Sequence, residues 1–216
     1  MNILINTKDL IESIPSDVTL VAVSKTKSVE EITQSYEAGQ RIFGENKIQE
    51  MAQKWESLPK DIAWHMIGHV QTNKVKYMAH FVDLIHGVDS SKLLKEIQKQ
   101  ALKHNRIIRC LIQIRIAEEE TKFGLPQDQL TELLEDTKTL TNVEIVGLMG
   151  MASFTENINQ ITEEFKSLQH LFDKTKQTFK NFEILSMGMS GDYHIAIQCG
   201  SNMIRVGSKI FGARNY

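Results

Sequence analysis

Residues 19–25 read TLVAVSK, a short apolar run that ends in a lysine. Similar runs rich in Val, Ile, Leu and Met recur along the chain. They lie at 19–25, 41–45, 63–68, 83–89, 107–116, 143–151, 182–189 and 202–207. Nearly continuous apolar runs, without polar alternation, are typical of strands covered on both faces of a parallel sheet. The sequence therefore predicts eight buried strands.

Helical segments are predicted between these strands, and several follow a Ser, Asp or Asn that can cap a helix. They lie at 28–38, 45–56, 90–104, 126–138, 157–177 and 190–199, with a further helix before residue 19. Alternation of strands and helices predicts an α/β fold. Eight units in 216 residues fit the small end of the size range of a (β/α)8 barrel. We therefore expect a single TIM barrel over residues 1–216, with an extra N-terminal helix and no second domain. A doubly wound open sheet is the alternative.

Composition narrows the classes of partner. The chain is 41% hydrophobic and 24% charged, and its net charge is −2. The sequence has no basic stripe of the kind that binds nucleic acid. It has no run of 18 apolar residues that would suggest a membrane span, and its N-terminus does not resemble a secretory leader. Cys110 and Cys199 lie far apart without metal-ligand spacing, as expected of buried thiols in a reducing compartment. We expect a cytoplasmic protein that binds neither nucleic acid nor membrane.

Polar residues gather where the predicted strands end. Lys25 ends the first strand, Asn46 follows the second and His69 follows the third. The segments SMGMSGD (186–192) and RVGS (205–208) place Gly and Ser between a strand and a helix. Such turns direct backbone N–H groups and a hydroxyl toward a phosphate, and the loops after strands seven and eight are the usual phosphate site of this barrel.

In a closed barrel the eighth strand pairs with the first, so Lys25 and these turns become neighbours. A partly desolvated lysine amine can attack a carbonyl. A compound with both an aldehyde and a phosphate is pyridoxal 5′-phosphate (PLP). Arg205 is placed to face its ring nitrogen and, because a guanidinium keeps its proton, would leave PLP a weak electron sink. The alternatives are a Lys25 that only reaches water and an Arg205 paired with Glu45.

Six segments in order carry a family resemblance: VAVSKTK, FGENKIQE, WHMIGHVQTNK, GLMGMAS, LSMGMSGDYHIAI and GSNMIRVGSKIFGAR. They resemble the pyridoxal phosphate homeostasis proteins, small PLP-binding relatives of the alanine racemase N-terminal barrel. The resemblance implies PLP held as an internal aldimine on Lys25. It implies a cofactor site made of Lys25, Asn46, His69, Met187, Ser190, Gly191, Arg205, Gly207 and Ser208. Ser208 stands where the family usually has threonine, which retains the hydroxyl.

No metal site is predicted. His65, His69 and His86 lie near strand ends, but their spacing does not match a metal site, so ordinary polar or core roles are favoured. The methionines near the strand ends are interpreted as packing residues.

The resemblance implies intracellular PLP homeostasis without robust turnover, with PLP-dependent enzymes as candidate clients and the protein acting as a monomer. Alanine racemase adds a second domain and a tyrosine base from a partner subunit. Because this chain ends at Tyr216, soon after Arg205, we expect neither. One alternative is a PLP-dependent racemase or lyase with Lys47, His69 or Tyr193 as its base. Another is a PLP-free aldolase that uses Lys25 directly. No catalytic residue is assigned.

Overall fold

A computed structural model describes residues 2–119 and 123–212. Eight parallel strands form a closed barrel in the order β1 to β8, with β8 pairing with β1. The strands are β1 (Thr19–Val23), β2 (Ile42–Glu45), β3 (Ala63–Met66), β4 (Leu84–Val88), β5 (Ile108–Ile114), β6 (Val143–Gly150), β7 (Ile184–Ser186) and β8 (Met203–Val206). The barrel prediction is confirmed, and the open sheet is excluded because β1 and β8 are hydrogen-bonded neighbours.

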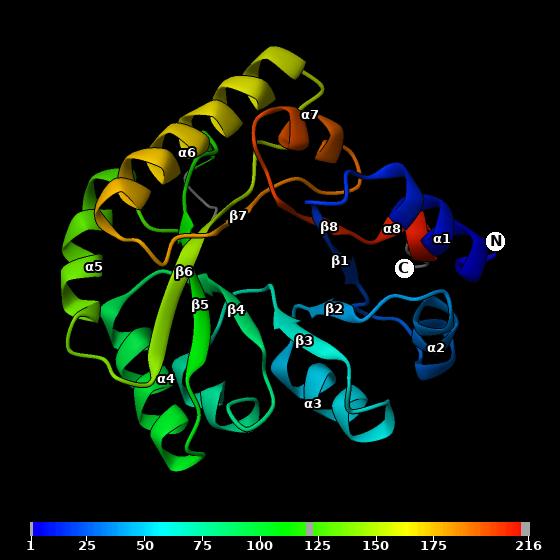
Figure 1. The fold of residues 1–216 in the computed structure, drawn as a ribbon, viewed down its shortest axis with the longest axis horizontal. Coiled ribbons are helices and arrows are strands. Elements are labelled where there is room, and N and C mark those ends of the chain that lie inside the picture. Colours follow the sequence, from blue (N-terminus) through cyan, green and yellow to red (C-terminus); the bar gives the residue numbers. More distant parts are fainter. Residues whose placement is uncertain (1, 120–122, 213–216) are drawn as a thin grey trace.

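Helices surround the barrel, and α1 packs beside α2 and α8 (Figure 1). The α-helices are α1 (Ile3–Ser13), α2 (Val29–Glu37), α3 (Ile48–Ser57), α4 (Ser91–Lys103), α5 (Leu130–Thr137), α6 (Ile158–Thr178), α7 (Tyr193–Gln198) and α8 (Ser208–Phe211). Two 3₁₀ helices, η1 (Thr72–Tyr77) and η2 (Gln127–Gln129), complete the set. The N-terminal helix was expected, whereas η1 and the short α8 were not. Within the described residues, no helix is both long enough and apolar enough to cross a bilayer.

Capping residues fix where several helices begin. Before α2, Ser28 Oγ accepts the N–H of Glu31, and the Glu31 carboxylate accepts the N–H of Ser28. At α1, α4 and α6, the side-chain oxygens of Asn2, Ser90 and Asn157 each accept one backbone N–H of the first turn. Such caps satisfy N–H groups that the first helical turn leaves unpaired. They therefore favour the start of α1, α2, α4 and α6 at these residues.

The core has two layers. The larger one lies between the strands and the helices, and its biggest buried side chains include Trp64, Phe43 and Phe165. A smaller apolar cluster includes Val21, Leu84, Leu111, Val146, Met149, Ile184 and Met203. Polar side chains are buried as well, among them His65, His86, Ser186 and Arg205. Burial of such groups is unfavourable unless they are hydrogen-bonded, which makes their partners informative.

Two phenylalanines offer a matched test of this packing. Phe165 on α6 is fully buried, whereas Phe154, in the loop after β6, is 97% exposed. We expect Phe165→Ala to lower the free energy of unfolding by about 3–5 kcal/mol through lost burial and a residual cavity. Phe154→Ala should change it by less than about 0.5 kcal/mol. Urea unfolding followed by circular dichroism measures both, and equal losses would contradict this packing.

Candidate functional site

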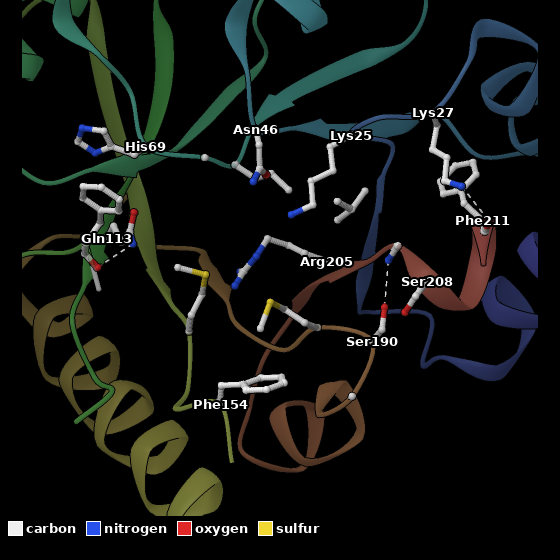
Figure 2. Close-up of a pocket in the computed structure, with 18 of the residues that line it drawn as sticks. Lys25, Lys27, Asn46, His69, Gln113, Phe154, Ser190, Arg205, Ser208 and Phe211 are labelled. Atoms are coloured by element: carbon white, nitrogen blue, oxygen red, sulfur yellow. Dashed lines mark hydrogen bonds between the residues drawn. The ribbon is translucent and has the colours of Figure 1, made fainter. Parts of the chain in front are cut away.

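A cavity of about 490 Å³ lies at the carboxyl ends of the strands. That is within the usual size range of small-molecule sites. Figure 2 shows its lining side chains, which include Lys25, Asn46 and Arg205. The predicted site residues that line it are Lys25, Asn46, His69, Ser190, Gly191, Arg205, Gly207 and Ser208. Closure of the barrel thus brings together residues from both ends of the chain.

Met187 does not line the cavity, and its prediction as a pocket residue is corrected. The preceding residue, Ser186, hydrogen-bonds within the barrel interior to Arg205 and His86. Because successive strand residues point to opposite faces, Met187 faces outward, where it is fully buried in the larger core. Met151 and Met189 line the cavity instead.

The turn that carries Lys25 is held on both sides. Lys25 is half-buried and its amine points into the cavity, toward Arg205 and Asn46 (Figure 2). On one side, Ser24 Oγ donates to Glu45 Oε1 at 2.6 Å. On the other, Thr26 adopts a left-handed φ of 66° and donates its N–H to a carboxylate oxygen of Glu50 at 2.6 Å. A non-glycine residue in this conformation needs such support.

Lys54 ties these groups together beneath the turn. Its buried ammonium contacts Glu45 Oε1 at 2.7 Å, Glu50 Oε1 at 2.7 Å and the Ser24 carbonyl at 2.8 Å. Burial raises the pKa of Glu45, although Lys54 opposes the shift. Glu45 therefore pairs with Lys54, and the alternative of an Arg205–Glu45 ion pair is wrong. The sequence analysis missed Lys54, although it falls on the buried face of α3 with Ile48.

Arg205 places a buried cation at the cavity. Its Nη1 donates to Ser186 Oγ at 2.6 Å and its Nη2 donates to the Gly150 carbonyl at 2.9 Å. Only 4% of the residue is exposed. Burial lowers the pKa of Arg205 to about 10, so the guanidinium still carries its charge at neutral pH.

The two Gly–Ser turns are joined to each other. Gly207 donates its N–H to Ser190 Oγ at 3.1 Å, which connects the loop after β8 to the loop after β7. The hydroxyl of Ser190 accepts this bond and can still donate its own proton to a ligand. Gly188 has a φ of +94°, and a Cβ there would lie 2.6 Å from the Cβ of Ala196. The loop after β7 therefore requires glycine at that position.

The cavity lining is positively charged. Lys25, Lys27 and Arg205 contribute cations, and none of the described lining residues is Asp or Glu. The ammonium of Lys27 contacts Glu31 at 3.1 Å and the carbonyl of Phe211 at 3.0 Å. Three cations beside two hydroxyl-bearing turns suit an anionic ligand such as a phosphate ester. An amine in the same cavity can also react with an aldehyde.

One of the three candidate bases lines the cavity. His69 stacks on Phe123 with ring centroids 4.1 Å apart, and its Nδ1 lies 3.8 Å from Asp89. Lys47 is the exposed N-cap of α3, and Tyr193 is buried at the start of α7. Neither is a lining residue.

Gln113, Phe123 and Phe154 are among the lining residues that the sequence analysis did not identify. Gln113 lies on β5, and its amide donates to the Phe123 carbonyl at 2.9 Å. A polar residue within the apolar run 107–116 was the available signal for Gln113. The two phenylalanines lie in loops, where the sequence showed no pattern that pointed to the cavity.

His65 and His86 are buried within the barrel, and neither lines this cavity. His86 Nε2 lies 3.0 Å from His65 Nδ1, and His65 Nε2 lies 3.5 Å from Asp83. Burial lowers the pKa of both histidines; Asp83 opposes the shift at His65, whereas His65 and Arg205 add to it at His86. Arg109 lowers the pKa of His65 further. Both imidazoles are therefore neutral in the folded protein at neutral pH.

These histidines should make stability depend on pH. Below the ordinary histidine pKa of 6.5, the unfolded chain takes up protons that the folded protein does not, so the free energy of unfolding falls as pH falls. Above that value the effect is absent. We expect a loss of up to about 1 kcal/mol for each buried histidine between pH 7.5 and 5.5, with the larger share from His86. Urea unfolding at both pH values should show a smaller loss in His86→Gln than in wild type. The control, His170→Gln at an exposed position, should match wild type; equal losses in all three proteins would refute the expectation.

Comparison with known proteins places this geometry in a family. The family model described as "Alanine racemase, N-terminal domain" matches residues 2–215. The Pyridoxal phosphate homeostasis protein of Aquifex aeolicus is 41% identical over 199 residues, which cover 91% of this chain and 87% of that protein. The protein of the same name from Haemophilus influenzae is 39% identical over 204 residues, covering 92% and 86%.

A solved structure shows the same relationship. PipY of Synechococcus elongatus, solved with PLP bound, has a TM-score of 0.89 and 32% sequence identity. The alignment covers 97% of this chain and 100% of PipY. The chain therefore belongs to the alanine racemase N-terminal domain family and, within it, to the pyridoxal phosphate homeostasis proteins.

Proposed function

We propose that this protein binds PLP in the cavity at the carboxyl ends of the strands and serves in intracellular PLP homeostasis, holding the cofactor on Lys25 without robust turnover. One observation carries the proposal: an amine, a buried guanidinium and two hydroxyl-bearing turns line one cavity whose described lining lacks carboxylates. The names of the relatives and the PLP bound to PipY support it.

The donor set fits the parts of the cofactor. PLP supplies an aldehyde that condenses with a lysine amine, together with a ring nitrogen and a phosphate. We assign the phosphate to the turns that contain Ser190, Gly191, Gly207 and Ser208. Lys25 would provide the amine, Arg205 would face the ring nitrogen, and Asn46 and His69 would lie beside the ring. Hydroxyls, backbone N–H groups and cations are the usual partners of a bound phosphate.

The role of holder rather than catalyst is supported by Arg205, and by the finding that only His69 of the three candidate bases is among the described lining residues. A guanidinium does not readily transfer its proton, so Arg205 can donate a hydrogen bond to the ring nitrogen without protonating it. The electron-withdrawing power of the cofactor then stays low. A racemase or lyase is the second candidate, because His69 lines the same cavity and could act as a base.

We further propose a cytoplasmic location, action as a monomer and PLP-dependent enzymes as clients. Cys110 and Cys199 are both buried free thiols, as is common in a reducing compartment. Burial raises the pKa of each thiol, which keeps both in the unreactive protonated form.

Covalent capture at Lys25 tests the proposal directly. After incubation with PLP and reduction with borohydride, peptide mass mapping should find the modification on Lys25 in wild type and none in Lys25→Ala. Lys27→Ala is the matched control, because Lys27 lines the same cavity but its ammonium is already held by Glu31 and Phe211. Modification of Lys25 should persist in that variant.

The same loaded protein distinguishes the holder from the enzyme. Incubated with a panel of L-amino acids, it should leave their enantiomeric composition unchanged on chiral chromatography. Many turnovers per protein would favour the racemase or lyase. Absence of modification at Lys25 in wild type would refute the proposed binding mode.

Loss of the turn hydroxyls should affect only the phosphorylated vitamer. Ser190→Ala and Ser208→Ala each remove a donor to a charged acceptor, a bond of about 1.5–3 kcal/mol. We expect each variant to bind PLP roughly 10-fold to 100-fold more weakly, with little change for pyridoxal, which lacks the phosphate. Fluorescence titration with both ligands measures the ratio. An equal loss for both would show that these serines do not contact the phosphate.

A further inference from the structure

A chain of polar side chains crosses the barrel from the cavity to the opposite mouth. Arg205 Nη1 lies 2.6 Å from Ser186 Oγ, which lies 3.2 Å from His86 Nδ1. His86 Nε2 lies 3.0 Å from His65 Nδ1, and His65 Nε2 lies 3.5 Å from Asp83 Oδ2. The members come from β8, β7, β4, β3 and the residue before β4. The side chain of Asp83 is 49% exposed, so the chain begins in the dry interior and ends at water.

The two ends of this chain differ in what they can do. A guanidinium can only donate hydrogen bonds, and an ionised carboxylate can only accept them. A neutral imidazole has one N–H and one acceptor nitrogen. An ionised Asp83 at 3.5 Å favours the His65 tautomer that carries its proton on Nε2, and the Nδ1 of that tautomer accepts from His86. His86 Nδ1 then accepts the hydroxyl proton of Ser186, whose lone pairs face Arg205.

This direction of hydrogen bonding requires both imidazoles to be neutral. The groups around His65 and His86 keep them so. His86 is fully buried and faces only His65 and Arg205 among the described charged and titratable groups that act on it. His65 faces Asp83 and, at longer range, Arg109. The positive charge of Arg205 and the dry interior both disfavour a second proton on His86. The chain is therefore a neutral relay between one fixed cation and one carboxylate.

A second cavity meets the far end of the chain. It measures about 280 Å³, lies at the amino ends of the strands, and is lined by His65 and Asp83 together with Arg109 and Glu183. Glu183 pairs with Arg109 rather than with the chain. The amino-terminal mouth thus holds one carboxylate that belongs to the polar chain, Asp83, and two that do not, Asp17 and Glu183.

We propose that Ser186, His86 and His65 are positioning residues, which hold the Arg205 guanidinium in place through a hydrogen-bond chain whose direction is set by Asp83 at the opposite mouth of the barrel. If Asp83 loses its charge, His65 can turn its donor toward His86, and Ser186 can receive a proton from His86 instead of giving one. The Ser186 oxygen that accepts from Arg205 would then also accept from His86, which changes the hydrogen bonding of the guanidinium. The link to ligand binding rests on the function proposed above, whereas the hydrogen-bond chain from Arg205 to Asp83 does not depend on that function.

The ligand-free protein provides the first test. In protein with ¹⁵N-labelled histidine, long-range ¹H–¹⁵N spectra at pH 7.5 should show both His65 and His86 as neutral rings protonated on Nε2. Asp83→Asn should shift the ring nitrogen signals of His86, which does not touch Asp83. Glu183→Gln removes a charge from the same mouth without touching the chain and should leave His86 unchanged. A His86 ring protonated on Nδ1 in wild type, or one that does not respond to Asp83→Asn, would overturn the proposal.

The PLP-loaded protein provides the second test. Ser186→Ala removes the acceptor of Arg205 and should weaken PLP binding about tenfold, with a shift in the visible absorption of the bound cofactor. Ser186→Thr keeps the hydroxyl and should restore both. Asp83→Asn should displace the pH profile of that absorption, and Glu183→Gln should not.

The outcomes separate the two proposals. If wild type takes up no PLP on Lys25, the proposed function fails. The histidine spectra would still show whether the hydrogen bonds from Asp83 to Arg205 run in the proposed direction. If wild type binds PLP but Asp83→Asn gives the same absorption profile as Glu183→Gln, the positioning role is wrong. Asp83 is exposed, so its variant provides this comparison even if Ser186→Ala does not fold.

Discussion

The pairing of β8 with β1 is the constraint on which the site depends. It joins Leu20 to Ile204 and Val21 to Arg205 in parallel register and closes the barrel. In an open sheet of the same strand order these two strands would be opposite edges. Closure places the amine after β1 beside the turns after β7 and β8, and it seals the interior in which Arg205 is buried. Without the pairing of β1 with β8, Lys25, Lys27 and Arg205 would not line one cavity.

Buried charge is stabilised in two separate places. Beneath the Lys25 turn, the ammonium of Lys54 bonds to two carboxylates and a backbone carbonyl. Beneath the cavity, the charge of Arg205 meets a hydroxyl and a carbonyl, with no described carboxylate bonded to it. A buried cation needs full hydrogen bonding. The first cluster fixes the backbone that presents an amine, and the second leaves a guanidinium available to a ligand.

Much of this architecture could be predicted from local sequence, and the remainder depends on closure. Apolar runs predicted all eight strands because both faces of a barrel strand are covered, and the Gly–Ser turns predicted the position of Ser190 and Ser208. Met187 was misplaced because its direction depends on Ser186 facing inward, which local pattern does not reveal. Ser186 and His86 are separated by 100 positions in the sequence, so their contact arises only from the closed barrel.

The bond from Gly207 to Ser190 has a consequence for the speed of ligand capture. These two turns are already joined without any ligand, so they do not have to come together around an incoming anion. Association is then governed by diffusion and by the field of the three lining cations, which attracts a phosphate and weakens as salt is added. A site built in this way can take up an anionic ligand quickly when the concentration of that ligand rises.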